Sequence, residues 1–203
     1  MKEEMIGVLT DDKSNGYEEM AEQFIARRNH TIGVANVRSW SRTLAPGSSI
    51  LDLGCGNGIP ISKVLIEEGF DVWGIDASEK MICAFRSEFP GMHAECCAVE
   101  DSELYQHEFD GVIAWGLIFL LAPEMQRHVI HKMAKSLKPQ GKFLFTAPEQ
   151  EHMWIDVLTR RKSFSLGRHS YLQLLAENGL ALDGEQTDEG DNHYYLSSKI
   201  EAV

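Results

Sequence analysis

The chain has 203 residues, of which 43% are hydrophobic and 25% are charged, a balance typical of one folded domain and not of a disordered chain. Nineteen basic residues stand against 31 acidic ones, for a formal net charge of −12, which disfavours nucleic acids and anionic membrane surfaces as partners. The longest apolar run, Ala114–Pro123, is far shorter than the ~20 residues that cross a bilayer. We therefore expect one domain over residues 1–203, with no nucleic-acid or membrane partner.

Cysteine usage and the amino-terminal sequence both indicate a reducing compartment. The four cysteines form no CxxC pair and have no histidine at metal-ligand spacing, which disfavours a zinc site and a disulfide framework. The segment Met1–Glu4 lacks the basic and apolar regions of a signal peptide. We expect a cytoplasmic protein without a metal site.

Two apolar stripes with helical spacing come first along the chain. They are Tyr17, Met20, Ala21 and Phe24, and then Val37, Trp40 and Leu44. We interpret the two helices that they predict, within residues 1–46, as a lid over the core formed by residues 47–203.

Short apolar segments then alternate with amphipathic ones from residue 49 to residue 180. Five predicted strands are nearly continuous in apolar character, as in a parallel sheet buried on both faces, and they are Ser49–Leu53, Asp71–Ile75, His93–Cys97, Gly111–Trp115 and Lys142–Thr146. The predicted helices are Pro60–Glu68, a segment between Ser78 and Pro90, Pro123–Leu137 and Ser170–Asn178. This alternation predicts βαβ units with right-handed crossovers.

The last part of the chain reads as two strands, Leu180–Thr187 and His193–Ile200, joined by only five residues. So short a connection predicts an antiparallel pair added to the sheet. Alternation in the second strand sets Tyr194 on one face, and His193 with Tyr195 on the other.

A glycine-rich turn follows the first strand, with Gly54, Gly56 and Gly58 at alternate positions and a helix directly after them. Glycine reaches backbone conformations closed to other residues and lets a ligand approach the main chain, and a helix amino terminus offers free N–H groups. In open α/β sheets ligands bind at the carboxyl ends of strands where the strand order reverses. We expect the ligand site at this turn.

Two carboxylates indicate what kind of ligand this is. Asp76 ends the second predicted strand, where a carboxylate suits the two hydroxyl groups of a ribose. Asp52 lies two residues before the first glycine, where it would repel a pyrophosphate and favour an ammonium. The glycine spacing also differs from the GxGxxG of dinucleotide enzymes. Together these features predict a nucleoside cofactor with an amino-acid head.

Over residues 17–200 the chain resembles the small-molecule branch of the class I S-adenosylmethionine-dependent methyltransferases. The resemblance rests on Asp52–Gly58, Gly74–Ser78 with Met81, Phe109–Ile113, Leu137–Gly141, and the stripe from Tyr17 to Phe24. It implies an α/β fold with a doubly wound, mostly parallel sheet of seven strands in the order 3-2-1-4-5-7-6, strand 7 antiparallel, beneath amino-terminal lid helices. It also implies S-adenosyl-L-methionine as cofactor and S-adenosyl-L-homocysteine as product.

The resemblance further implies which residues bind the cofactor. They are Tyr17, Asp52, Gly54, Cys55, Gly56, Asp76, Ala77, Met81, Val99, Glu100, Ala114 and Trp115. In this scheme Asp52 lies near the cofactor's ammonium, Asp76 holds its ribose, and Trp115 lines the side of the methyl group. Ala98 stands where many relatives have an aspartate, so Glu100 or Asp101 is expected to bind the adenine amino group.

The acceptor side is open to two interpretations. Because the last strand is antiparallel, the turn before it lies at the same edge as the carboxyl ends of the parallel strands. We expect His193, with Tyr195, to position or deprotonate the acceptor, and the carboxylates of the turn to favour a cationic or amine-bearing one. The alternative is a solvated acidic turn. The long connection Ala147–Arg168 either covers the acceptor pocket or is a basic surface turn.

Methyl transfer to O, N or S of a small molecule is the leading functional hypothesis. The segment Ala114–Leu117 stands where methylases of nucleic-acid bases carry Asn/Asp-Pro-Pro-Tyr, which favours a small acceptor, and a protein side chain remains an alternative acceptor. A nicotinamide-dependent oxidoreductase and a non-catalytic, S-adenosylmethionine-binding regulatory module are the competing functions, because one fold serves many activities.

Overall fold

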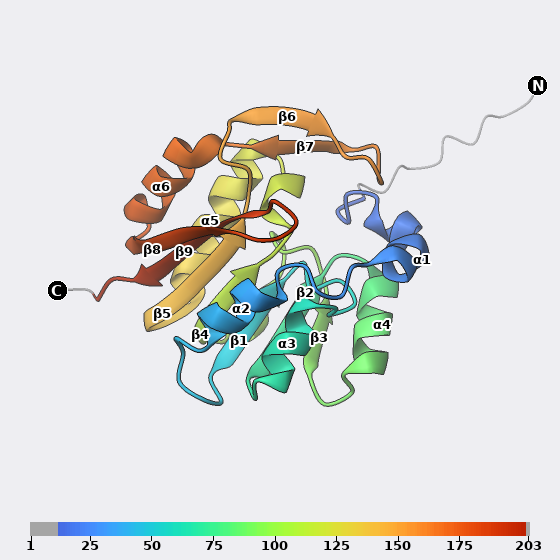
Figure 1. The fold of residues 1–203 in the computed structure, drawn as a ribbon, viewed down its shortest axis with the longest axis horizontal. Coiled ribbons are helices and arrows are strands. Elements are labelled where there is room, and N and C mark those ends of the chain that lie inside the picture. The colour runs from blue at the N-terminus through green and yellow to red at the C-terminus, as the bar shows by residue number, and fades with distance from the viewer. Residues whose placement is uncertain (1–11, 202–203) are drawn as a thin grey trace, which may run out of the picture.

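Seven strands form one twisted sheet in the order β3-β2-β1-β4-β5-β9-β8 in the computed structural model, which describes residues 12–201 (Figure 1). The strands are β1 Ser49–Leu53, β2 Asp71–Asp76, β3 His93–Cys96, β4 Phe109–Ala114, β5 Leu137–Thr146, β8 Leu180–Thr187 and β9 His193–Lys199. The first five are parallel, and β9 is antiparallel to both β5 and β8. Since β8 and β9 are the sixth and seventh strands of this sheet, the predicted order 3-2-1-4-5-7-6 is confirmed.

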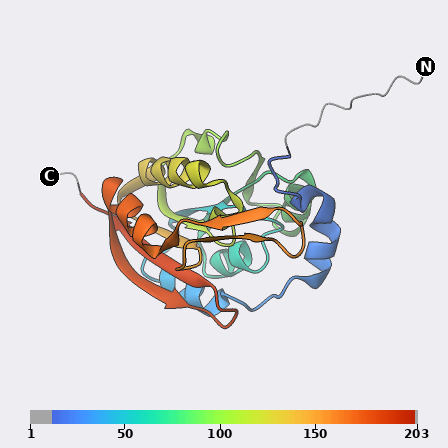
Figure 2. The ribbon, with the colours of Figure 1, turned by 90° about the horizontal axis from the view of Figure 1, so that it is seen from above.

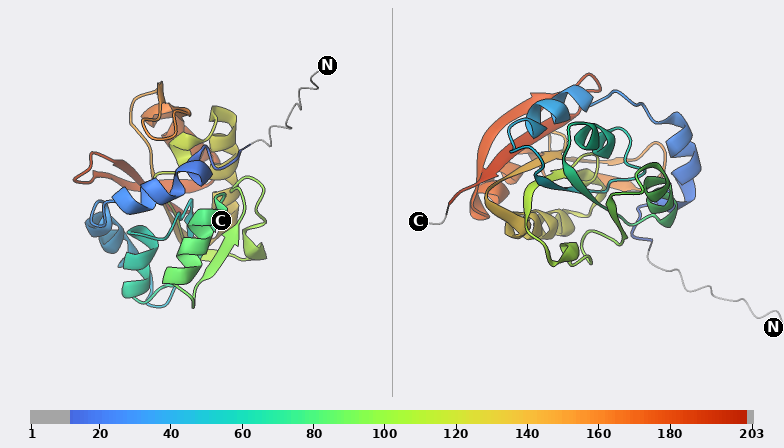
Figure 3. Two further views of the ribbon diagram at one scale, coloured as in Figure 1. Left: turned by 90° about the vertical axis from the view of Figure 1, so that its right-hand side faces the viewer. Right: turned by 90° about the horizontal axis from the view of Figure 1, so that it is seen from below.

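Helices cover both faces of the sheet (Figure 3). They are α2 Val34–Ser41, α3 Ile61–Glu67 and α4 Glu79–Glu88 on one face, and α5 Pro123–Ser136 and α6 Gly167–Glu177 on the other. Along β1 the side chains alternate between these layers: Ile50 packs in the α2–α3 cluster, whereas Leu51 and Leu53 pack in the α5–α6 cluster. Both faces of β1 are therefore buried, and all five of its residues are buried, the polar Ser49 and Asp52 included.

Local signals in the sequence account for the helix boundaries. Ser78 caps α4, because its side chain accepts a hydrogen bond from the backbone N–H of Met81 at 3.2 Å. Pro123 occupies the first turn of α5, where its missing N–H costs nothing. Gly69 follows α3 with a φ of 87°, the conformation that ends helices at glycine.

The strand β3 differs from its prediction. It lies at the edge of the sheet, and His93 and Cys96 at its two ends are exposed. None of its four residues is fully buried, so the expectation of burial on both faces is wrong there. The open side of an edge strand leaves its side chains accessible to solvent at their flank.

The connection between β5 and α6 folds into a second, two-stranded antiparallel sheet of β6 His152–Ile155 and β7 Lys162–Ser165, which the sequence analysis missed. Its turn contains neither glycine nor proline. Instead Asp156 Oδ1 accepts the backbone N–H groups of Leu158 and Thr159 at 2.9 and 2.7 Å, and Arg160 takes a φ of 60°. Figure 2 shows this hairpin lying above the carboxyl ends of the parallel strands.

The two amino-terminal helices have different surroundings. The helix α1, Tyr17–Arg27, lies beside α4, whereas α2 packs against α3 and buries Val37 and Trp40 in the core. Across residues 12–201, no helix combines the length and apolar character needed to cross a membrane.

Candidate functional site

A cavity of about 500 Å³ lies at the carboxyl ends of β1, β2 and β4, where the strand order reverses between β1 and β4. This is the place where open α/β sheets bind ligands, and the volume is in the range of small-molecule sites. All predicted cofactor-binding residues line it except Asp52 and Ala114.

The glycine-rich turn forms the floor of the cavity. The N–H groups of Gly54 and Cys55 both donate to the carbonyl of Ile75, at 2.8 and 3.1 Å, and so tie the turn to β2. Gly56 has a φ of 55°, and a Cβ there would have Met81 Sδ as its nearest neighbour, at 3.9 Å. The main chain at Gly56 is therefore open to a ligand.

Asp76 lines the cavity at the tip of β2 and is held by the main chain. Its Oδ2 accepts the N–H of Gly56 at 2.9 Å, and its Oδ1 accepts the N–H of Ser78 at 2.8 Å. Burial raises the pKa of Asp76, and these two hydrogen bonds oppose that shift. Each oxygen keeps acceptor capacity for one further donor, as a pair of ribose hydroxyls requires.

Asp52 lies beneath the turn and does not line the cavity, so the expectation of a carboxylate inside the pocket is not met. It is 2% exposed, and its Oδ2 accepts the hydroxyl of Ser62 at 2.5 Å. Burial raises its pKa to about 7, whereas the Ser62 hydrogen bond and the Arg28 charge lower it. From this position Asp52 would not touch a ligand in the cavity and could affect it only through its charge. Ala114 is likewise fully buried.

Arg28 brings a cation to the cavity wall, and the sequence analysis missed it. Its Nε donates to the carbonyl of Ile59 at 3.2 Å, and its guanidinium lies 4.8 Å from the Phe24 ring and 4.6 Å from the Trp115 ring. Burial lowers its pKa, and the nearby Tyr17 and Asp52 oppose that shift. Nothing in the sequence singles out this residue, because an arginine after a helix usually faces solvent.

Of the two acids expected at the adenine, Glu100 lines the cavity together with Val99, and Asp101 does not. Lys13 lies near both carboxylates, 2.5 Å from Asp101 Oδ2 and 3.9 Å from Glu100 Oε1. Ala98, at the position where many relatives have an aspartate, is buried and does not reach the cavity.

His193 and Tyr195 are not on the cavity wall. The Tyr195 ring is fully buried against Phe145 at 4.8 Å between centroids, and its hydroxyl has no hydrogen-bond partner among residues 12–201. The opposite face of β9 points toward the site, since the Tyr194 hydroxyl accepts the indole N–H of Trp115. The geometry therefore gives the predicted catalytic roles of His193 and Tyr195 no support.

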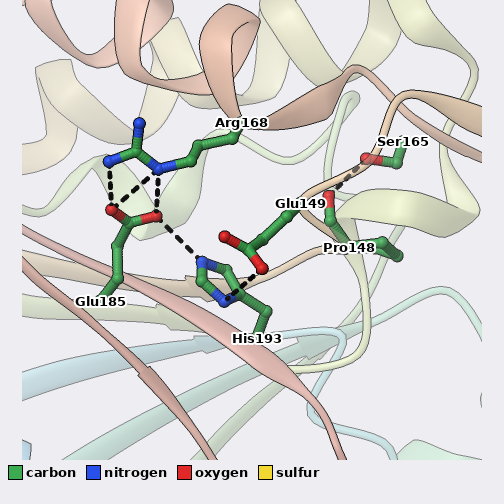
Figure 4. Close-up of polar contacts among 6 residues, drawn as sticks. All are labelled: Pro148, Glu149, Ser165, Arg168, Glu185 and His193. Carbon is green, nitrogen blue, oxygen red and sulfur yellow. Dashed lines mark hydrogen bonds and ion pairs between the residues drawn. The ribbon is translucent and has the colours of Figure 1, made fainter.

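His193 instead belongs to an ion-pair network at the outer edge of the sheet (Figure 4). Its Nε2 lies 3.0 Å from Glu185 Oε1, and its Nδ1 lies 3.8 Å from Glu149 Oε2. Arg168 binds Glu185 through Nη2 at 2.6 Å and Nε at 2.9 Å. The histidine and the two carboxylates are close enough together to suggest a cation site, but the guanidinium already neutralises Glu185 and would repel a metal ion.

The part of the cavity wall that follows β4 is apolar. It includes Leu117, Phe119, Leu120 and Met125. The hairpin closes over this part from outside: Trp154 packs on Phe119 at 5.6 Å between ring centroids. The hairpin turn also meets the amino-terminal segment, through Arg161 Nη2 and Asp12 Oδ2 at 3.5 Å.

Comparisons with known proteins agree with this geometry. The model of a family described as a methyltransferase domain matches residues 50–141, which contain the glycine-rich turn and Asp76. No curated protein matches the sequence.

Three solved structures illustrate the similarity in fold. The 1,6-didemethyltoxoflavin-N1-methyltransferase of Burkholderia thailandensis has a TM-score of 0.76 and 15% identity, over 93% of this chain and 87% of that one. A putative methyltransferase of Haloferax volcanii, in complex with the Trm112 activator, has a TM-score of 0.73 and 14% identity, over 94% and 99%. A TehB-like methyltransferase of Corynebacterium glutamicum has a TM-score of 0.66 and 20% identity, over 93% and 98%. Residues 50–141 thus match a methyltransferase domain in sequence, and the whole chain shares the fold of these solved methyltransferases.

Proposed function

We propose that this protein transfers the methyl group of S-adenosyl-L-methionine to a small-molecule acceptor. One observation carries the proposal: a glycine-rich turn and the Asp76 carboxylate meet an apolar chamber in a single cavity at the reversal of strand order. The first part suits a nucleoside with an amino-acid head, and the second suits a small organic acceptor.

The polar groups of the cavity match the parts of this cofactor. Asp76 would accept the ribose hydroxyls, and Met81 and Val99 would pack on the adenine. The open main chain at Gly56 leaves room for the amino-acid head. Arg28 has one hydrogen bond among residues 12–201, through Nε, so its terminal nitrogens would bind the carboxylate in a bidentate manner.

The protein's contribution to the reaction is alignment. The bound cofactor supplies an electrophilic methyl group, and the protein holds the acceptor in line with it and excludes water. The apolar wall, formed by Leu117, Phe119, Leu120 and Met125, carries no group that could take up a proton, and the carboxylates that line the cavity, Asp12, Asp76 and Glu100, belong to other segments. We therefore favour an acceptor atom that is nucleophilic without a protein base, such as an amine or a thiolate.

The covering of the site supports a small acceptor. The hairpin and the amino-terminal segment pack on residues of the cavity wall, and the cavity has to hold the cofactor as well. The Burkholderia relative was solved with 1,6-didemethyltoxoflavin and S-adenosylhomocysteine, which supports a small acceptor here. The net charge of −12 disfavours nucleic acid.

A transfer assay tests the proposal. The protein is incubated with S-adenosylmethionine that carries a labelled methyl group, in separate reactions with amines, thiols, phenols and carboxylic acids of low molecular mass. We expect label in the product of one acceptor class. Binding of S-adenosylhomocysteine without transfer to any member of the panel would instead indicate a non-catalytic binding module.

A further inference from the structure

We infer that Tyr194 and Asp188 are positioning residues of the cofactor site: they fix the indole of Trp115, and the indole orients the Arg28 guanidinium toward the carboxylate of the cofactor. The inference rests on the proposed function. Asp188 and Tyr194 are absent from the residues implied by the resemblance, and neither lines the cavity, so they act on the ligand only through Trp115 and Arg28.

A chain of two hydrogen bonds runs from the turn between β8 and β9 to the cavity wall. The indole Nε1 of Trp115 donates to the Tyr194 hydroxyl at 2.5 Å, and that hydroxyl donates to Asp188 Oδ2 at 2.7 Å. Tyr194 is fully buried, and burial together with the Asp188 carboxylate raises the pKa of Tyr194 far above its usual range. The hydroxyl therefore stays protonated. Since indole has a single N–H donor, this bond selects one orientation of the ring.

Asp188 is distinct from the other acids of its turn. Glu189 and Asp191 are exposed, whereas Asp188 is 7% exposed. Its Oδ1 accepts the backbone N–H groups of Gly190 at 2.8 Å and Asn192 at 3.0 Å. The turn is thus folded around this carboxylate, which is held in place to receive the Tyr194 hydroxyl.

Gly33 shows how closely the surrounding structure fits this hydrogen bond. A Cβ at Gly33 would lie 2.6 Å from the Tyr194 hydroxyl and 2.9 Å from Trp115 Nε1. Contacts below 3 Å are repulsive, so only glycine allows the main chain before α2 to pass beside the bond.

The indole fixes Arg28 in turn. The guanidinium lies 4.6 Å from the Trp115 ring and 4.8 Å from the Phe24 ring, and Nε is bound to the carbonyl of Ile59. A guanidinium that contacts aromatic rings keeps its remaining N–H groups free for a carboxylate. If the indole rotates, this arrangement is lost and Arg28 has to be ordered by the ligand itself.

Comparing the Kd values of two ligands distinguishes this positioning role from a general loss of stability. S-adenosylhomocysteine carries the carboxylate, and its decarboxylated analogue lacks only that group. We expect Tyr194→Phe to raise the Kd of S-adenosylhomocysteine about three- to tenfold, the loss typical of one hydrogen bond. The Kd of the analogue should change less than about twofold, because it does not use Arg28. An equal rise in the Kd of both ligands, or no rise in either, would overturn the inference.

Two controls complete the experiment. Tyr195→Phe removes a hydroxyl without a partner from the opposite face of the same strand, and it should leave both Kd values unchanged. In a Trp115→Phe background, which lacks the indole N–H, adding Tyr194→Phe should not change the ratio of the two Kd values further. A further change would show that Tyr194 acts by another route and would contradict the inference. If the unmodified protein does not bind S-adenosylhomocysteine, the proposed function fails first and this inference fails with it.

Discussion

Asp52 and Asp76 end neighbouring parallel strands but experience different surroundings. Asp76 lines the cavity and accepts two backbone N–H groups, from Gly56 and Ser78. Asp52 is buried beneath the turn with the Ser62 hydroxyl as its partner. Asp76 is therefore suited to contact a ligand directly. Asp52 is suited to set the electrostatic potential under the amino-acid head, where an ammonium would stabilise its charged form.

Asp76→Asn tests the direct contact. An asparagine has one acceptor oxygen where the carboxylate has two, so the pair of ribose hydroxyls loses a charge-assisted hydrogen bond. We expect the Kd of S-adenosylhomocysteine to rise about tenfold or more, as measured by calorimetry. Asp71→Asn, at the exposed start of the same strand, is the matched control and should bind like the unmodified protein. An unchanged Kd for Asp76→Asn would exclude its role at the ribose.

Asp52 should make the stability of the ligand-free protein depend on pH. Its folded-state pKa of about 7 is raised above the value near 4 of an unfolded chain. Between these two values the folded state holds a proton that the unfolded state releases, so Asp52 lowers stability as the pH rises from about 4 to about 7.

Asp52→Asn should remove this pH dependence. We expect the variant to unfold at a higher temperature than the unmodified protein at pH 7.5, and the difference to shrink at pH 4.5. Its free energy of unfolding at pH 7.5 should exceed that of the unmodified protein by a few kcal/mol at most, on the order of 1.4 kcal/mol for each pH unit by which the pKa is raised. The same difference at both pH values would show that Asp52 does not titrate in this range.

Residue types, spacing and the family resemblance together pointed to many of the residues that line the cavity, because turn glycines and a carboxylate at a strand tip have local causes. They did not identify Arg28 or Tyr194. Both act through partners that are distant in the chain, such as Ile59 for Arg28 and Asp188 and Trp115 for Tyr194. These contacts depend on how the elements pack and leave no periodic pattern in the sequence.

Among the elements, the strands of the main sheet followed from hydrophobic patterning and their order from the family resemblance, but neither predicted the hairpin. Its strands are only four residues long and its turn is held by the Asp156 side chain, so neither length nor glycine and proline signals mark it. The alternation along β9 was also correct. Which face reaches the cavity depends on the pairing of Tyr194 with Thr146 and of Tyr195 with Phe145, which short-range patterns do not determine.

The contact between the hairpin and the amino-terminal segment should keep the site covered. Gly16 has a φ of 87°, and a Cβ there would lie 3.1 Å from Thr159 Cβ, so Gly16→Ala should push the hairpin turn away. We expect faster hydrogen exchange of the amides in residues 152–165. Gly47→Ala is the control, since it has a φ of 75° and no neighbour within 4 Å. Both substitutions introduce about 1–2 kcal/mol of backbone strain. If both variants show the same amide exchange rates in residues 152–165, the effect does not come from the contact between Gly16 and the hairpin turn.

At the scale of the whole molecule, the order of the strands determines where the chemistry lies. The chain turns from β1 toward β2 and β3 on one side and continues with β4 and β5 on the other, so the loops after β1 and β4 diverge and leave a crevice. The antiparallel β9 brings the turn that contains Asp188 to the same edge of the sheet. Residues of the first half of the chain, such as Asp76, line the cavity. Tyr194 and Asp188, from its last part, contact the cavity wall through Trp115.

If this crevice binds the S-adenosylmethionine type of cofactor, calorimetric titration should detect it. The purified protein is titrated with S-adenosylhomocysteine, NAD and NADP under identical conditions. We expect a Kd in the micromolar range for S-adenosylhomocysteine and no heat of binding for the two nicotinamides. Binding of NAD or NADP, with none of S-adenosylhomocysteine, would show that the crevice is not a site for this cofactor and would favour an oxidoreductase on the same sheet.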